Sequence, residues 1–167
     1  MSIRKVVRYG EDSLRQPSKE VHKVKNLVAD LLDTMYAQNG VGLAAPQIGE
    51  NYRVFVIDVS TGNEPLNPIV FINPKIIKKS GAVISHEGCL SFPEAFTDVR
   101  RYSDVMVKAM DRNGRSFVLE AKDGSLLARA IQHEFDHLDG ILFIDHVINR
   151  FEAEEVLKKF NLPPIQI

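Results

Sequence analysis

Residues 123–140 read DGSLLARAIQHEFDHLDG, and this stretch decides how the rest of the chain is interpreted. Its apolar side chains recur every three or four positions, which predicts an amphipathic helix. Ser125 or Asp123 is placed to cap the start of the helix, and Asp139-Gly140 predicts its end. We expect its apolar surface to be buried in the core and its polar motif to face a cleft.

The segment HEFDH at 133–137 is the strongest chemical signal in that helix. Positions i and i+4 of a helix share a face, so His133 and His137 can present two imidazoles to one metal ion. Glu134 lies between them and can reach a metal-bound water as a general base. The alternative is an ordinary pair of helical histidines, because short matches to this motif occur by chance. Asp136 is interpreted as an exposed helical acid, with a role behind a ligand histidine as the alternative.

Two protein ligands do not complete a catalytic metal site, which usually has three. Downstream of the helix, Phe143 stands where a common zinc-protease pattern has its third histidine, and His146 and the acids of 145–155 are the groups that remain. We therefore look upstream. Cys89 is the only cysteine of the chain, and a thiolate is a strong ligand for zinc or ferrous iron. His86 competes less well, because it and the cysteine face opposite sides of an extended segment.

The neighbours of Cys89 bear on its role. A free cysteine is often only a small buried residue, and this interpretation stays open from the residue alone. Gly88 permits a close backbone approach beside the thiol. If Glu87 is buried it needs a partner, for which Arg101 or Arg100 is our candidate.

The stretch GVGLAAPQIG at 40–49 follows a predicted helix over 24–40 and precedes a predicted strand over 52–60. It is not a dinucleotide fingerprint, which follows a strand, and it lacks the lysine of a phosphate loop. One interpretation is a tight turn between helix and strand. The other is a strand-like edge that receives an extended peptide, with Gln47 directed into the site.

The middle of the chain is rich in predicted strands. Residues 69–81 read as two strand segments with a turn or bend at Asn73-Pro74, and 104–121 as a hairpin joined at Asn113-Gly114. A last amphipathic helix is predicted over 149–160. This order of elements predicts an α+β fold, with a mostly antiparallel sheet packed around the HEFDH helix.

Length and composition set the broad class of the protein. We expect 167 residues to form a single catalytic domain over 1–167. The net charge of −1 argues against nucleic acid or an anionic membrane as a partner held by bulk charge. One cysteine suits a reducing compartment, no apolar run approaches the roughly 20 residues of a membrane span, and no secretory signal is visible. A cytoplasmic location is expected.

Three short motifs together resemble the peptide deformylase family. They are Gly-Val-Gly-Leu-Ala-Ala-Pro-Gln at 40–47, Glu-Gly-Cys-Leu-Ser at 87–91 and His-Glu-Phe-Asp-His at 133–137. They stand in this order at separations like those of the family, so the resemblance covers nearly the whole chain and implies the peptide deformylase fold. It also implies hydrolytic removal of the formyl group from the formyl-methionine of nascent polypeptides at the ribosome, with release of formate.

The resemblance further implies the parts of the active site. One ferrous ion, which zinc, nickel or cobalt can replace, would be held by Cys89, His133 and His137. Glu134 would be the general base toward metal-bound water, and the Gln47 side chain and the Leu90 backbone N–H would donate to the oxyanion. By the same resemblance the substrate would lie extended beside the backbones of Gly42 and Gly88. Our candidates for the walls of its methionine pocket are Val41, Leu90, Ala130 and His133.

Two other functions fit part of these motifs. Another HExxH hydrolase, such as a peptidase, would share the general base, but the absent downstream ligand and the presence of Cys89 with Gln47 weigh against it. A metal- or peptide-binding module without catalysis would have no use for Glu134. Phe96 stands where some relatives carry basic residues, which leaves the preference beyond methionine open.

Overall fold

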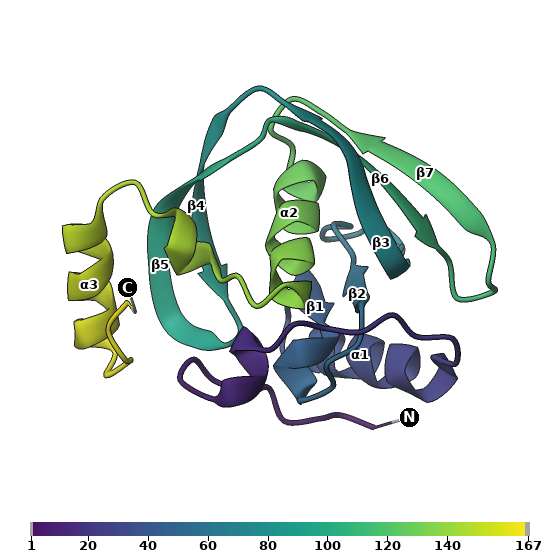
Figure 1. Cartoon of the computed structure of the whole chain (residues 1–167), viewed down its shortest axis with the longest axis horizontal. Helices are drawn as coiled ribbons and strands as arrows, with labels where there is room; N and C mark the ends of the chain where they lie inside the picture. Colours follow the sequence, from purple (N-terminus) through teal and green to yellow (C-terminus); the bar gives the residue numbers. More distant parts are fainter. Residues whose placement is uncertain (1, 166–167) are drawn as a thin grey trace.

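Helix α2 (Leu126–Leu138) lies at the centre of the computed structural model, which describes residues 2–165 (Figure 1). The Ser125 hydroxyl accepts a hydrogen bond from the Ala128 N–H at 3.1 Å and caps the first turn. The helix predicted over 123–140 is therefore confirmed, with Ser125 as its cap.

Five strands form the larger sheet in the order β1-β2-β3-β6-β7, and every neighbouring pair is antiparallel. The strands are β1 (Gly42–Ala44), β2 (Val54–Ile57), β3 (Ile69–Ser80), β6 (Asp104–Met110) and β7 (Ser116–Ala121). The hairpin predicted at Asn113-Gly114 is confirmed, and so is the strand within 52–60. β1 lies at the edge of the sheet, so the stretch after the first helix is a strand and not only a turn.

The turn or bend predicted at Asn73-Pro74 does not divide the segment into two strands, because β3 continues through both residues. Asn73 has a φ of +49°, a conformation that asparagine tolerates better than most residues. The register between β3 and β6 shifts between Ile72 and Lys75. A β-bulge therefore absorbs the irregularity without ending the strand.

A separate two-stranded sheet is formed by β4 (Val83–Cys89) and β5 (Phe92–Arg101). It lies on one side of α2, and β3, β6 and β7 lie on the other (Figure 1). We did not predict this hairpin, because Gly88 and Pro93 interrupt its strand pattern and its turn has no Asn-Gly pair. The hairpin places the cysteine motif opposite the HEFDH helix.

The larger sheet is covered on both faces near β2. Val54 and Val56 pack against α1 (Lys25–Ala37), whereas Phe55 and Ile57 belong to the cluster that includes α2. This explains the continuous apolar sequence of β2, which is buried on both sides. A third cluster joins β5 to α3 (Arg150–Lys159).

Three short 3-10 helices complete the described structure. They are η1 (Asp12–Arg15), η2 (Ala45–Ile48) and η3 (Phe143–His146). η2 follows β1 directly and contacts α2, and η3 follows α2 and packs the Phe143 ring against His133. Across residues 2–165, no helix combines the length and apolarity needed to cross a membrane.

Candidate metal centre and catalytic site

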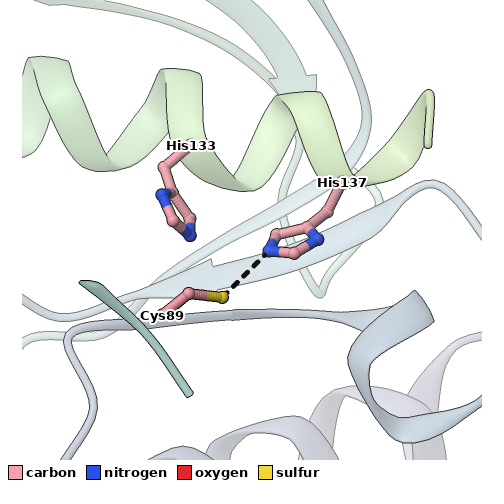
Figure 2. Close-up of side chains that lie close together, drawn as sticks. All are labelled: Cys89, His133 and His137. Carbon is pink, nitrogen blue, oxygen red and sulfur yellow. Dashed lines mark hydrogen bonds between the residues drawn. The ribbon is translucent and has the colours of Figure 1, made fainter. Parts of the chain in front are cut away.

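Two positions of α2 and one position of β4 meet at the centre of the molecule. His133 and His137 project from one face of the helix toward Cys89 (Figure 2). The potential ligand atoms of the three side chains all lie within 4.8 Å of one another, and Cys89 Sγ is 3.5 Å from His137 Nε2. One thiolate and two imidazoles are a donor set suited to zinc, iron, cobalt or nickel. These residues therefore fit a single metal ion.

The path of β4 decides which of its side chains face this cluster. The register of β4 with β5 shifts between Glu87 and Cys89, so the strand is irregular just before the thiol. Cys89 is half-buried at the cluster, whereas the His86 side chain is 67% exposed and lies 2.8 Å from Asp98. His86 is therefore outside the cluster, as its position in an extended segment predicts.

Glu87 holds His133 in one orientation. Its Oε1 accepts a hydrogen bond from His133 Nδ1 at 2.9 Å, and the Arg101 guanidinium donates to both of its oxygens at 2.8 and 2.9 Å. An ionised carboxylate can only accept, so His133 Nδ1 carries a proton, and Nε2 is the nitrogen that would bind a metal. Arg101 is the partner of Glu87 that we expected from the sequence, and Arg100 is exposed.

Two buried carboxyl groups near the cluster have opposite pKa shifts. Burial raises the pKa of Glu87, but the hydrogen bonds from Arg101 and His133 outweigh burial and hold that pKa below its ordinary value. Burial raises the pKa of Glu134 to about 7, and the charge of His133 opposes this only in part. Near neutral pH, Glu87 is a fixed anion, whereas Glu134 can both take and return a proton.

The two imidazoles also differ. Burial lowers the pKa of His133, but Cys89 and Glu87 raise it more, so it lies well above its ordinary value. Burial and the nearby charge of His133 hold the pKa of His137 well below its ordinary value. A metal ion that binds here must therefore displace a proton from His133.

η2 presents Gln47 to the thiol. Gln47 Oε1 accepts the Ala44 N–H at 3.0 Å, which fixes the orientation of the side-chain amide. Its Nε2 lies 3.4 Å from Cys89 Sγ and 3.2 Å from Ser91 Oγ. The donor end of the amide is therefore directed toward the cluster.

Glu134 lies directly against β1. A Cβ atom on Gly42 would lie 2.7 Å from Glu134 Oε2, so a side chain at this position would displace the carboxylate. Glu134 is 5% exposed, and its Oε1 has no hydrogen-bond partner within residues 2–165. A buried acceptor without a protein partner is available to water or substrate.

A cavity of about 740 Å³ opens beside the cluster, and Cys89, Gln47 and Glu134 line it. This volume is typical of sites that enclose a small ligand or part of a peptide. The residues predicted to contact substrate line the same cavity: Val41, Gly42, Gly88, Leu90, Ala130 and His133. His137 is 1% exposed and lies deeper.

Sequence reasoning missed several contacts around the site. Asp136 is not the exposed acid that we expected, because it is half-buried and accepts hydrogen bonds from Arg101 and His146. The ring of Phe143 packs against that of His133, with centroids 5.9 Å apart. These contacts depend on how η3 folds back against α2, which no local sequence pattern indicates.

Comparison with known proteins agrees with this geometry. The sequence profile of the family described as polypeptide deformylase matches residues 3–153. Similar curated proteins include a peptide deformylase of Baumannia cicadellinicola, 47% identical over 165 residues that cover 96% of each chain. Peptide deformylase 1 of Clostridium perfringens is 47% identical over 150 residues, which cover 87% of this chain and 99% of the relative.

Solved structures show the same fold. A peptide deformylase from Legionella pneumophila superposes with a TM-score of 0.88 at 38% identity, covering 96% of this chain and 94% of the other. One from Synechococcus elongatus, solved in complex with actinonin, superposes with a TM-score of 0.87 at 42% identity, covering 96% and 90%. The chain therefore belongs to the peptide deformylase family, metalloenzymes that remove the N-terminal formyl group from nascent peptides.

Proposed function

We propose that this chain hydrolyses the formyl amide of N-terminal formyl-methionine at the cluster of Cys89, His133 and His137, with Glu134 as the general base. The observation that carries the proposal is the position of Glu134. It is a buried carboxylate with a pKa of about 7 and an unpartnered oxygen, on the same cavity as the metal-binding donor set.

We infer one ferrous ion per chain, held by Cys89, His133 and His137, which zinc, nickel or cobalt can replace. When bound, the ion would supply Lewis-acid chemistry, lowering the pKa of water and polarising the formyl oxygen. Glu87 supports this binding, because it keeps the Nε2 lone pair of His133 directed into the cluster.

Glu134 moves the proton of the reaction. Its carboxylate accepts a proton from the water whose oxygen attacks the formyl carbon, and it returns that proton to the amine nitrogen as the carbon–nitrogen bond breaks. The products are formate and a peptide with a free amino group. Burial raises the pKa of Glu134 above that of an ordinary carboxyl group, which makes it a better proton acceptor.

Two donors are assigned to the oxygen that gains negative charge at the formyl carbon. The first is the Gln47 side-chain amide, whose orientation is fixed by Ala44. The second is the backbone N–H of Leu90, which lines the cavity next to Cys89. Loss of one donor of this kind typically costs about 2.7–4 kcal/mol in the activation barrier.

The substrate is assigned an extended position between β1 and β4. β1 pairs with β2 on one side, which leaves its other side available to an extended peptide. The backbones of Gly42 and Gly88 are our candidates for hydrogen bonds to the peptide. The methionine side chain is assigned to apolar walls made by Val41, Leu90 and Ala130, beside the ring of His133.

Because the substrates are nascent peptides, we infer that the enzyme acts in the cytoplasm and meets them near the ribosome. Cell fractionation and co-sedimentation with translating ribosomes test these two inferences separately. Recovery of the protein outside the cytoplasm would contradict the first.

The activity is tested by formate release from a formyl-methionyl tripeptide. The protein is stripped with a chelator and reloaded with nickel, or with iron under anaerobic conditions. We expect release that disappears on chelation and returns with metal, and no cleavage of the unformylated tripeptide. Cleavage of the unformylated peptide would favour a peptidase.

The matched variant is Glu134→Gln, which keeps the size of the side chain and removes the base. We expect it to retain one equivalent of metal while formate release falls by about 10²–10⁴-fold, the usual contribution of a general acid–base group. Unchanged turnover in a metal-loaded variant would contradict the assignment of Glu134.

A further inference from the structure

We propose that His146, which lies partly at the surface, is a positioning residue for the candidate metal ligand His133. The inference rests on the proposed metal centre and not on the identity of the substrate. An unbroken chain of hydrogen-bonded side chains joins the two residues. From the surface inward, its members are His146, Asp136, Arg101, Glu87 and His133.

Every link of this chain is short. His146 Nε2 lies 3.0 Å from Asp136 Oδ2, and Arg101 NH1 donates to the same oxygen at 2.6 Å. Arg101 also donates to both oxygens of Glu87, at 2.8 and 2.9 Å, and Glu87 Oε1 accepts from His133 Nδ1 at 2.9 Å. The chain thus reaches the ring nitrogen that sets which nitrogen of His133 faces the metal.

Arg101 is the member through which His146 acts. Its side chain is 3% exposed, and it serves two carboxylates, Glu87 and Asp136. The position of its guanidinium group therefore depends on the relative attraction of the two carboxylates. In a buried network of this kind each hydrogen bond polarises the next, so a change at one end is felt at the other.

His146 shifts this balance toward Glu87. Because an ionised carboxylate only accepts, His146 Nε2 carries a proton and donates a hydrogen bond to Asp136 Oδ2. This second donor offsets part of the charge with which Asp136 attracts Arg101. Without it, Arg101 is drawn toward Asp136, and its paired hydrogen bonds to Glu87 lengthen. The orientation of His133 then loses part of its support.

The support is specific to one of the two ligand histidines. His137 Nδ1 is buried and has no hydrogen-bond partner within residues 2–165, so no comparable chain holds that ring. η3 also contacts His133 directly, since the Phe143 ring packs on it. Arg15 anchors the same turn through Asp145 at 2.6 Å. η3 is therefore a fixed platform from which His146 can act.

The simpler alternative is that His146 only fastens η3 to α2. The two roles differ in what they change. A fastening contact affects the stability of the fold, whereas a positioning contact affects the geometry and affinity of the metal site in the folded protein. A metal-centred spectrum and a metal dissociation constant therefore distinguish them, in addition to turnover.

The experiment compares His146→Phe and His146→Ala, which remove the donor, with His146→Gln, whose amide can donate from nearly the same place. His22→Phe is the control, because His22 is an exposed histidine remote in sequence from the five hydrogen-bonded residues. The probe is cobalt(II), whose thiolate charge-transfer and ligand-field absorption report the geometry at Cys89 and the two histidines. Its dissociation constant is measured by competition with a chelator.

We expect His146→Phe and His146→Ala to shift the cobalt spectrum and to raise the dissociation constant roughly 10-fold, the low end of the loss seen when a partner behind a metal ligand is removed. The cobalt dissociation constant of His146→Gln should lie within about twofold of that of the unchanged protein. His22→Phe should have the same dissociation constant as the unchanged protein. The side chain of His146 is 38% exposed, so both variants are expected to fold. Unfolding curves of the metal-free variants check this.

Lower stability of His146→Phe and His146→Ala, with an unchanged spectrum and dissociation constant, would assign a fastening role and overturn the proposal. Equal losses in His146→Phe and His146→Gln would overturn it too, because the donor would then be irrelevant. If the cobalt results agree with expectation while the unchanged protein releases no formate, the proposed function fails and this inference stands. The two ideas are thus separable.

Discussion

The candidate metal ligands come from two regions that are built in different ways. α2 supplies His133 and His137 through helical spacing alone. Its N-cap, Ser125, directly precedes the first residue of the helix. The β4–β5 hairpin supplies Cys89 from a strand whose register with β5 shifts just before the cysteine. A helix that forms at all places its two imidazoles together, whereas the hairpin must be held in place.

The hairpin nevertheless controls one ligand of the helix. Glu87 of β4 orients His133, and Arg101 of β5 completes that support, while His137 Nδ1 has no partner in the described part of the chain. The regions also carry buried carboxylates of opposite character. The hairpin holds Glu87 as a paired anion, and the helix holds Glu134 unpaired with a pKa of about 7. The hairpin therefore holds a stabilising ion pair, whereas the helix holds the group assigned to proton transfer.

The largest expected effect comes from removing the ligand of the hairpin. In Cys89→Ser the donor set loses its thiolate, and we expect the metal dissociation constant to rise by about a thousandfold. The reason is that binding free energy in such sites is spread over a few ligands, so each contributes about 4 kcal/mol. Chelator competition with zinc or cobalt measures the loss.

Phe96→Leu is a control within the same hairpin, because Phe96 lines the cavity without belonging to the donor cluster. We expect its metal affinity to be unchanged. If Cys89→Ser also retained its affinity, the ligand assignment would be wrong, and the histidines of α2 would have to bind with a different third group.

The same contrast explains how much of the molecule could be predicted from its sequence. The extent of α2, the Ser125 cap and the shared face of His133 and His137 follow from spacing and local chemistry. The hairpin at Asn113-Gly114 follows from its turn residues. These features depend on interactions among residues near in sequence, which a sequence displays directly.

The missed features are two irregular strands and a contact between residues distant in sequence. The β4–β5 hairpin has an irregular strand pattern, and the bulge at Asn73 keeps β3 continuous where local signals indicate a turn. The contact of Asp136 with Arg101 joins positions 35 residues apart. The resemblance of three motifs identified the metal-binding and catalytic candidates, but it did not reveal how their support is arranged.

The second prediction tests whether the hairpin depends on its buried ion pair. Glu87→Gln removes the charge of one of the two carboxylates that pair with the buried Arg101 guanidinium and leaves Asp136 as the other, and the Glu87 and Arg101 side chains are only 10% and 3% exposed. Breaking a buried pair from one side typically costs about 3–5 kcal/mol, and the retained Asp136 places this case at about 3 kcal/mol. We expect a loss of that size in the unfolding free energy of the metal-free protein at pH 7, measured with urea.

The double variant Glu87→Leu with Arg101→Met sharpens this prediction. Replacing a buried pair by apolar side chains of similar size is often close to neutral, so we expect it to recover much of the stability lost in the single variant. It should not recover metal affinity, since His133 still lacks its acceptor. A single variant as stable as the unchanged protein would contradict the view that this pair holds the hairpin.

The third prediction concerns the unpaired carboxylate of the helix. The folded pKa of Glu134 is raised to about 7 from an ordinary value of 4.5, so folding disfavours its charged form. The metal-free protein should therefore lose stability as the pH rises from about 4.5 to about 7, with the full penalty present above that range. Glu134→Gln has no such charge. The unfolding free energy of this variant should exceed that of the unchanged protein by about 1 kcal/mol at pH 5 and by about 3 kcal/mol at pH 8.

Urea unfolding of both metal-free proteins at the two pH values measures this difference. Glu87 predicts the opposite slope, because its pKa is lowered in the folded state and its contribution is lost as the pH falls below about 4.5. A stability difference that is the same at pH 5 and pH 8 would show that the charge of Glu134 is not destabilising. The contrast between a hairpin with a stabilising ion pair and a helix with a destabilising buried charge would then be unsupported.

The smallest expected effect lies where the hairpin packs on itself. A Cβ atom at Gly88 would lie 2.5 Å from Phe96 Cε1, but the Phe96 side chain is exposed enough, at 53%, to rotate away. We therefore expect Gly88→Ala to lower the unfolding free energy by only about 1 kcal/mol, at the mild end of overpacking. Phe96→Leu removes the ring, so the double variant should be more stable than the sum of the single effects predicts. Additive losses would mean that the ring is not the obstacle, and that the backbone at Gly88 itself requires glycine.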